Sequence, residues 1–315
     1  MIALAEIEAA RDRIRGAAVR TPLVRLPVED APAEIHLKLE NLQPISSFKI
    51  RGATNAVRLA PPSASAGGLV TASAGNMAQG VAWAARSLGV PATIAVPEHA
   101  PEAKLAAIAR LGGRVLKLPY DDWWNVIVTS HVDGAEGLFV HPVQDPAVMA
   151  GNGTIGLEIL EDLPAPDAVV IPYGGGGLAV GIASAIRALR PETKIFTAEP
   201  ETGAALAAAV AAGHPVDVDY RASFVDGAGS RRVLDSMWPL ITPLIDGALV
   251  VSVAEVAAAV RLMAERARVI AEGAGALALA AAMSGQAGQG KVVCVVSGGN
   301  INLDKLAAIL TGATS

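Results

Sequence analysis

The sequence is poor in cysteine, in aromatic residues and in charge. Its 315 residues include one cysteine, 3% aromatic residues and 17% charged residues. A single cysteine excludes a disulfide framework within one chain. Cys294 lies inside an apolar run, which is typical of a buried thiol in the reducing cytoplasm. With so few aromatic rings, the core has to be packed mainly from aliphatic side chains.

Basic clusters and long apolar runs are also missing. Lysine and arginine total 25 against 30 acidic residues, for a net charge of −5. Binding to nucleic acid needs a basic face, so we expect no nucleic-acid partner. No stretch reaches the roughly 18 uncharged apolar residues that span a bilayer. The acidic start of the chain does not resemble a signal peptide. We therefore expect a cytoplasmic protein that acts on a small molecule away from membranes.

Apolar strand-like runs alternate with helical patterns along the chain. We expect strands at residues 34–40, 68–72, 92–96, 114–118, 168–172, 194–198 and 292–296, and helices at about 48–59, 77–88 and 102–111. This alternation indicates an α/β protein with largely parallel sheets covered by helices on both faces. The segment from His141 to Gly153 is the expected crossover between two lobes. Ligands of such sheets bind at the carboxyl ends of the strands.

Lys49 is the first residue of chemical interest. In the segment Ser46-Ser-Phe-Lys-Ile-Arg-Gly52, Ser46 or Ser47 can cap the next helix, which places Lys49 in its first turn. A cation there opposes the helix dipole, at a cost of about 0.3–1 kcal/mol. A solvated lysine could simply accept this cost. Alternatively, the positive potential and partial burial lower the pKa of the amine, which makes it nucleophilic and able to form an imine.

Four consecutive glycines, Gly174 to Gly177, separate an expected strand from a helix. Without Cβ atoms, their backbone amides can converge on one anion at the helix start. Each hydrogen bond to a charged group contributes about 1.5–3 kcal/mol, so several could hold a phosphate without a cationic side chain. A tight turn needs fewer glycines, and we therefore favour an anion site.

The same loop also fits a dinucleotide pattern. Gly174, Gly176 and Ala179 match G-x-G-x-x-A, and Glu199 ends the next strand, where an acid could bind a ribose. This alternative predicts a nicotinamide-dependent oxidoreductase but leaves Lys49 unexplained. A third alternative is a catalytically silent protein that binds an amino acid or a phosphate.

Two further segments follow expected strands. Thr71-Ala-Ser-Ala-Gly-Asn-Met77 offers backbone amides, the Ser73 hydroxyl and the Asn76 amide as a second anion cradle. Ser297-Gly-Gly-Asn300 offers one hydroxyl at the end of the last strand. Each alone could be an ordinary cap or turn. Together with Lys49, two cradles suit a phosphorylated cofactor and a carboxylate substrate.

In order and spacing, these segments resemble the fold-type-II pyridoxal-phosphate enzymes, specifically the threonine dehydratase and serine racemase group. The resemblance runs from Thr21 to Ile301. It is carried by Lys38-Leu-Glu-Asn-Leu-Gln43, Ser47-Phe-Lys-Ile-Arg-Gly-Ala53, Ser73-Ala-Gly-Asn76 with Gln79-Gly80, Gly151-Asn-Gly-Thr-Ile-Gly-Leu-Glu158, Gly174 to Gly177, Glu272-Gly-Ala-Gly275 and Ser297-Gly-Gly-Asn300.

The resemblance implies a two-lobed, tryptophan-synthase-β-like α/β fold, in which each lobe is a largely parallel sheet flanked by helices. Residues 1–50 and 147–315 would form the large cofactor-binding domain, and residues 51–146 the small domain. The chain ends soon after its last expected strand, so we expect a short form without a regulatory domain. Apolar surfaces in such a chain favour a homodimer.

The resemblance also implies residue roles. Lys49 would hold pyridoxal 5'-phosphate as a Schiff base and then act as the base at the substrate Cα. The implied cofactor-binding residues are Phe48, Lys49, Asn76, Gly174, Gly175, Gly176, Gly177, Leu178, Glu272, Ser297 and Gly298. The implied substrate-binding residues are Ser73, Ala74, Gly75, Asn76 and Met77.

The implied reaction follows from Ser297, which would face the ring nitrogen. A hydroxyl need not keep that nitrogen protonated, which favours β-elimination over transamination. We expect a dehydratase (ammonia-lyase) that converts a β-hydroxy-α-amino acid such as L-threonine or L-serine, through an aminoacrylate, to a 2-oxo acid and ammonia. A β-replacement synthase is the nearest alternative.

Two departures bear on specificity. Serine racemases carry a second serine where this chain has Ala74, and the missing hydroxyl argues against racemisation, which needs a proton donor on each face. Met77 replaces the usual histidine and makes the wall of the pocket less polar. We hypothesise that the substrate has a bulkier or more apolar β-substituent, with phenylserine or hydroxyaspartate as candidate types. Alternatively, Met77 tunes the cofactor pocket.

Other departures concern the surroundings of the site. Glu199 matches the first acid of the metal site of some relatives, but Ala205 occupies the second position, so we predict no metal. His141-Pro-Val-Gln144 replaces His-Pro-Phe-Asp at the edge of the pocket. Asp121-Asp-Trp-Trp124 could form an aromatic lid, but we favour surface or interface packing, because tryptophan is enriched at interfaces.

Overall fold

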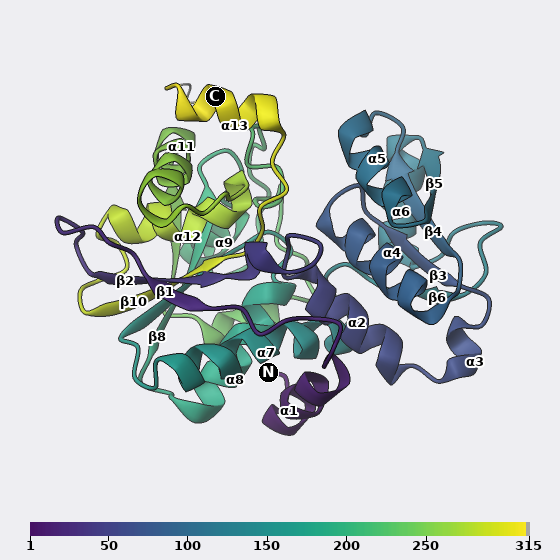
Figure 1. Cartoon of the computed structure of the whole chain (residues 1–315), viewed down its shortest axis with the longest axis horizontal. Coiled ribbons are helices and arrows are strands. Elements are labelled where there is room, and N and C mark those ends of the chain that lie inside the picture. Colours follow the sequence, from purple (N-terminus) through teal and green to yellow (C-terminus); the bar gives the residue numbers. More distant parts are fainter. Residues whose placement is uncertain (313–315) are drawn as a thin grey trace.

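The computed structural model describes residues 1–312, which form two lobes around two separate sheets (Figure 1). The strands are β1 (Leu23–Arg25), β2 (Glu34–Leu39), β3 (Leu69–Ala72), β4 (Ala92–Pro97), β5 (Gly113–Leu118), β6 (Leu138–Phe139), β7 (Ala168–Pro172), β8 (Lys194–Pro200), β9 (Gly247–Val251) and β10 (Lys291–Val296). The large lobe holds six strands in the order β1-β2-β10-β7-β8-β9, and the small lobe holds four in the order β5-β4-β3-β6. All neighbouring strands are parallel except β1 and β2.

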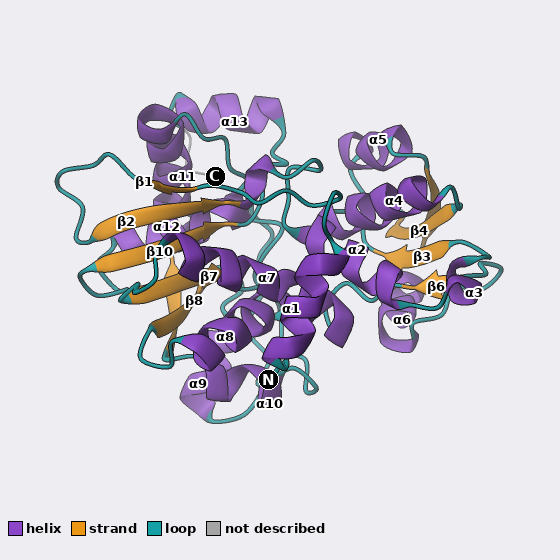
Figure 2. Cartoon of the chain, turned by 60° about the horizontal axis from the view of Figure 1, so that its bottom comes forward, coloured by secondary structure: helices purple, strands orange, loops and turns teal. Residues whose placement is uncertain are grey.

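Helices cover both faces of the large sheet (Figure 2). The helices of both lobes are α1 (Leu4–Arg13), α2 (Lys49–Leu59), α3 (Pro62–Ser65), α4 (Asn76–Leu88), α5 (Glu102–Arg110), α6 (Tyr120–Thr129), α7 (Pro146–Asp162), α8 (Gly177–Leu189), α9 (Ala205–Ala212), α10 (Trp238–Ile241), α11 (Val253–Leu262), α12 (Gly273–Met283) and α13 (Leu303–Leu310), with the short 3-10 helices η1 (Glu40–Leu42) and η2 (Thr242–Leu244) and the short π-helix η3 (Met263–Ala267). Every strand and helix expected from the sequence is present, with ends within two residues of the expected ones. The expected fold class is confirmed.

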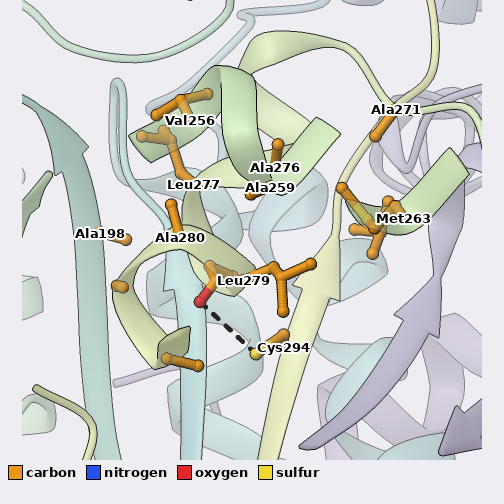
Figure 3. Close-up of a cluster of buried hydrophobic side chains, with 14 of the residues drawn as sticks. Ala198, Val256, Ala259, Met263, Ala271, Ala276, Leu277, Leu279, Ala280 and Cys294 are labelled. Atoms are coloured by element: carbon orange, nitrogen blue, oxygen red, sulfur yellow. Dashed lines mark hydrogen bonds between the residues drawn. The ribbon is translucent and has the colours of Figure 1, made fainter. Parts of the chain in front are cut away.

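The period-two pattern of the central strands separates two cores. In β10, Val292 and Cys294 face the core made with α11, α12 and α13, whereas Val293 faces the core made with α1, α7 and α8. Cys294 is fully buried, and its Sγ donates to the Ala278 carbonyl at 3.4 Å (Figure 3). Aliphatic side chains dominate both cores, as the scarcity of aromatic residues predicts.

The crossover from the small sheet to the large one is shorter than the sequence suggests. Helix α7 already begins at Pro146, so Gly151 and Gly153 lie inside a helix and not in a connecting loop. An added Cβ on Gly151 would lie 2.6 Å from the Arg51 carbonyl oxygen, and one on Gly153 would lie 2.9 Å from the Gly181 carbonyl oxygen. These glycines allow α2 and α8 to pack closely on α7.

Helix α2 contacts both α4 of the small lobe and α7 of the large lobe. The domain boundaries at residues 50 and 146 therefore stay a prediction. Within residues 1–312, no helix has both the length and the apolar character that crossing a bilayer requires.

Candidate active site

One cavity of about 480 Å³ receives side chains from both lobes. It lies at the carboxyl ends of β3, β7 and β10, and its volume is within the roughly 300–1,000 Å³ typical of small-molecule sites. The sequence-predicted residues that line it are Phe48, Lys49, Ser73, Ala74, Gly75, Asn76, Met77, Gly174, Gly175, Gly176, Gly177, Leu178, Glu272 and Ser297. Gly298 lies directly behind this wall, against Glu272.

Lys49 is fixed at the first residue of α2 by backbone contacts with the end of β10. The amide of Phe48 donates to the Ser297 carbonyl at 3.1 Å, and the amide of Gly299 donates to the Ser46 carbonyl at 2.9 Å. The expected serine cap is weak, because Ser47 Oγ accepts the Lys49 amide only at 3.4 Å. These contacts place the lysine and Ser297 in one cavity although they are far apart in sequence.

Within the described part of the chain, the Lys49 amine has no carboxylate partner. Its Nζ donates to the Pro142 carbonyl at 2.9 Å and lies 5.1 Å from the centroid of the Phe48 ring. Desolvation by the surrounding protein lowers the pKa of Lys49 to about 8. A substantial fraction of the amine is therefore neutral, and hence nucleophilic, near physiological pH.

This pKa predicts how the apoprotein captures an aldehyde. We expect the rate of covalent capture of pyridoxal phosphate to rise with pH up to about 8 and then level off, because the neutral amine is the reactive form. Stopped-flow absorbance between pH 6 and pH 10 measures this rate, with Lys49→Ala as the blank. A rate that keeps rising toward the pKa of an ordinary lysine, about 10.4, would contradict the lowered pKa.

The glycine loop between β7 and α8 has no room for side chains. An added Cβ on Gly175 would lie 2.4 Å from Val143 Cγ2, and one on Gly177 would lie 2.9 Å from the Val143 carbonyl oxygen. Gly176 has φ of +96°, a left-handed conformation that favours glycine. The loop thus presents bare backbone at the start of the thirteen-residue helix α8, which fits the phosphate group of pyridoxal phosphate.

Replacing Gly176 should weaken cofactor binding. Gly176→Ala strains the left-handed backbone by about 1–2 kcal/mol and puts a Cβ 3.1 Å from the Tyr173 ring. We expect the Kd for pyridoxal phosphate to rise about tenfold, as measured by fluorescence titration of the apoprotein. Gly89→Ala is the matched control, because Gly89 also has positive φ but an added Cβ there meets no atom within 4 Å. Equal affinities of the two variants would contradict the role of the loop.

The second cradle begins α4 and is tied to the large lobe. The Ser73 hydroxyl accepts the Gly75 amide at 3.2 Å. Asn76 Nδ2 donates to Glu272 Oε1 at 2.7 Å, and Asn76 Oδ1 accepts from Asn300 Nδ2 at 2.8 Å. This chain of amides fixes Asn76 at the cavity wall, between the two lobes.

Glu272 is a buried acid in direct contact with the site. Burial raises its pKa to about 7, although the Asn76 hydrogen bond opposes this rise. An added Cβ on Gly298 would lie 2.4 Å from Glu272 Oε1, so only glycine allows the carboxyl group to approach the end of β10. At neutral pH, Glu272 is therefore divided between its protonated and ionised forms.

His141 shapes the pocket edge, and the sequence did not identify it as a site residue. Its Nδ1 accepts the amides of Val143 at 3.0 Å and of Gln144 at 2.9 Å, which leaves Nε2 to donate to the Ile127 carbonyl at 3.2 Å. Burial lowers the pKa of His141, which favours this neutral form. The ring holds the loop that supplies the Pro142 carbonyl to Lys49 and packs Val143 on the glycine loop. No departure in the sequence signals this role, because His141 matches His-Pro-Phe-Asp and only Val143 and Gln144 differ from it.

Trp123 and Trp124, on α6, both line the cavity, with ring centroids 6.3 Å apart. Trp124 is also 46% exposed, so the pair borders the cavity and reaches the surface, and both the expected surface or interface packing and the aromatic-lid alternative stay predictions. The sequence could not decide, because the direction of α6 relative to the cavity depends on how the small lobe folds.

Glu199 does not contact the cavity. It is fully buried, and its carboxylate accepts the amides of Leu206 at 2.9 Å and Ala207 at 2.8 Å at the start of α9. This removes the ribose-binding acid that the dinucleotide alternative requires. In the described part of the chain, no group of three or more histidine, cysteine, aspartate or glutamate side chains could hold a metal ion. The expectation of no metal stays a prediction.

A buried network of charges lies directly behind Lys49. Arg51, on α2, donates to both oxygens of Glu40 at 2.8 Å and to Glu158 Oε1, on α7, at 2.6 Å. Lys38, on β2, donates to Glu158 Oε2 and to the Thr21 carbonyl, both at 2.6 Å. Two cations and two carboxylates thus join β2, η1, α2 and α7 and fix the start of α2, where Lys49 lies.

The two-lobed fold and the lining of this cavity fit an enzyme that binds a phosphorylated cofactor. Residues 14–298 match the family described as pyridoxal-phosphate dependent enzyme, and the chain belongs to that family. Pyridoxal phosphate is therefore its cofactor, as the sequence predicts.

Named relatives are similar over nearly the whole chain. L-threonine ammonia-lyase from Thermotoga maritima is 38% identical, over 98% of this chain and 78% of that protein. The catabolic L-threonine dehydratase TdcB of Escherichia coli is 36% identical, over 98% and 96%. Among solved structures, maize serine racemase superposes with a TM-score of 0.90 at 31% identity, over 98% and 96% of the two chains. Threonine deaminase isoform 2 from Solanum lycopersicum gives 0.88 at 32% identity, over 98% and 92%.

Proposed function

We propose that this enzyme is an ammonia-lyase that converts a β-hydroxy-α-amino acid, the class of L-threonine and L-serine, to a 2-oxo acid and ammonia. The observation that carries the proposal is the placement of Lys49, whose amine contacts a backbone carbonyl and no carboxylate of the described residues, in a cavity that has two backbone anion cradles. Relatives named threonine ammonia-lyase and threonine dehydratase support it.

Each part of the cofactor has a matching part of the cavity. Lys49 Nζ would attach to the aldehyde carbon, and the amides of the glycine loop would hold the phosphate. The Ser297 hydroxyl would face the ring nitrogen, and Asn76 Nδ2 would face the ring hydroxyl. When bound, pyridoxal phosphate supplies an electron sink for the electrons released at the substrate Cα.

The substrate carboxylate would bind the amides at the start of α4, beside Ser73. Lys49 Nζ, neutral at its lowered pKa, would accept the Cα proton. Ala74 has no hydroxyl to return a proton from the opposite side, so elimination is favoured over racemisation. The hydrogen bond from Asn76 to Glu272 would keep the amide oriented during the reaction.

The test is product analysis with purified holoenzyme. L-threonine, L-serine and β-phenylserine are incubated separately, and 2-oxo acid and ammonia are measured. We expect equal amounts of the two products from at least one substrate, and borohydride reduction should fix the cofactor on Lys49 in the peptide mass spectrum. Product that forms only with an added nucleophile would indicate a synthase, interconversion of enantiomers would indicate a racemase, and either result would overturn the proposal.

We also propose that the protein acts as a cytoplasmic homodimer. The free buried thiol of Cys294 is compatible with a reducing compartment. Leu42 and Ile270 are exposed, and the bond from Asn41 Nδ2 to the Ile270 carbonyl brings their segments together, which supports an apolar contact surface. Sedimentation equilibrium would measure the mass of the assembly, and a monomer would contradict the dimer.

A further inference from the structure

One wall of the cavity is apolar and is made by the small lobe. Helix α6 contributes Trp123, Trp124 and Ile127, and helix α4 contributes Met77. Met77 is 1% exposed and packs into the core of the small lobe, so it is a fixed part of this wall. Trp123 Nε1 is buried and has no hydrogen-bond partner among residues 1–312. The wall thus combines wide aromatic surfaces with one unsatisfied N–H donor.

The cations at the mouth of the same cavity are already paired. Lys104, on α5, forms an ion pair with Asp226 of the large lobe, across the mouth. Arg232 pairs with Asp235 at 3.2 Å. Apart from Lys49, these are the lysine and arginine side chains among the lining residues. The acidic partners of these cations therefore partly offset the attraction that the cations offer to a second carboxylate on the substrate.

We infer that the enzyme prefers a β-hydroxy-α-amino acid whose β-substituent is large and apolar, an aromatic ring above all. This inference rests on the ammonia-lyase function proposed above and names the substrate class of that site. Trp123 and Trp124 would contact the β-substituent, because aromatic rings pack favourably in offset or edge-to-face arrangements. Because Lys104 and Arg232 already have acidic partners, they offer little net attraction to an acidic β-substituent such as that of hydroxyaspartate.

The kinetic test compares kcat/KM for β-phenylserine, L-threonine and 3-hydroxyaspartate. We expect β-phenylserine to exceed L-threonine by roughly tenfold or more. Trp124→Ala should lower kcat/KM for β-phenylserine by roughly 10- to 200-fold and that for L-threonine by less than about 3-fold. Trp83→Ala is the matched control, because Trp83, on α4, does not line the cavity.

Binding of unreactive amino acids gives a second readout that does not need turnover. Calorimetry on the holoenzyme should show a lower Kd for L-phenylalanine than for L-alanine, and Trp124→Ala should remove the difference. A preference for L-threonine or 3-hydroxyaspartate, or equal losses for all substrates in Trp124→Ala, would overturn the inference alone. Absence of 2-oxo acid from every hydroxy-amino acid would instead overturn the ammonia-lyase proposal.

Discussion

Lys49→Ala should lower kcat by at least about 10³-fold, because the variant loses the group that we propose as both cofactor anchor and Cα base. The structure also predicts that the variant stays folded. The Lys49 side chain makes one hydrogen bond, to the Pro142 carbonyl, and borders a cavity to which water has access. The loss should therefore appear in turnover and not in the unfolding midpoint.

Steady-state 2-oxo acid release measures the first quantity, and urea unfolding of the apoproteins measures the second. Lys117→Ala is the control, because Lys117 is an exposed lysine outside the cavity. It should retain full activity. A Lys49→Ala variant that binds pyridoxal phosphate and still turns over at a tenth of the normal rate would rule out this lysine as the base.

Features that depend on local sequence could be predicted. The four glycines after β7 predict a backbone without side chains at the start of α8, and the helical pattern after Phe48 predicts that Lys49 lies in the first turn of α2. The uninterrupted apolar run of β10 indicates a strand with two buried faces. Because the loops of a parallel sheet converge at the carboxyl ends of its strands, these local features were enough to place the site.

Features that depend on contacts between distant segments could not be predicted in the same way. The ion pair of Lys104 with Asp226 joins residues from different lobes, and nothing near either residue in the sequence indicates its partner. His141 acts through a backbone carbonyl and a neighbouring valine, which a motif does not show. Gly151 and Gly153 weaken the helical pattern of α7 in the sequence, and the reason for them is visible only in the close packing of α2 and α8 on α7.

Arg51→Met should destabilise the protein by about 3–5 kcal/mol, because it leaves the carboxylates of Glu40 and Glu158 buried without their shared cation. Burial raises the pKa of Glu40, but the charge and hydrogen bonds of Arg51 outweigh burial and hold this pKa below its usual value. Methionine fills a similar space and removes only the positive charge and its donors. Urea unfolding at pH 7 measures the change, and Arg15→Ala, which breaks an exposed pair with Asp12, should cost at most about 1 kcal/mol.

The pH dependence distinguishes a lost charge from lost packing. In Arg51→Met, the pKa of Glu40 should rise above that of the unfolded chain, because burial is no longer opposed by the guanidinium. A raised carboxyl pKa adds stability below the unfolded value of about 4.3 and loses it as the pH rises, so the deficit of the variant should shrink as the pH falls from 7 toward 4. A deficit that is the same at both pH values would mean that the Arg51 side chain stabilises α2 by packing alone.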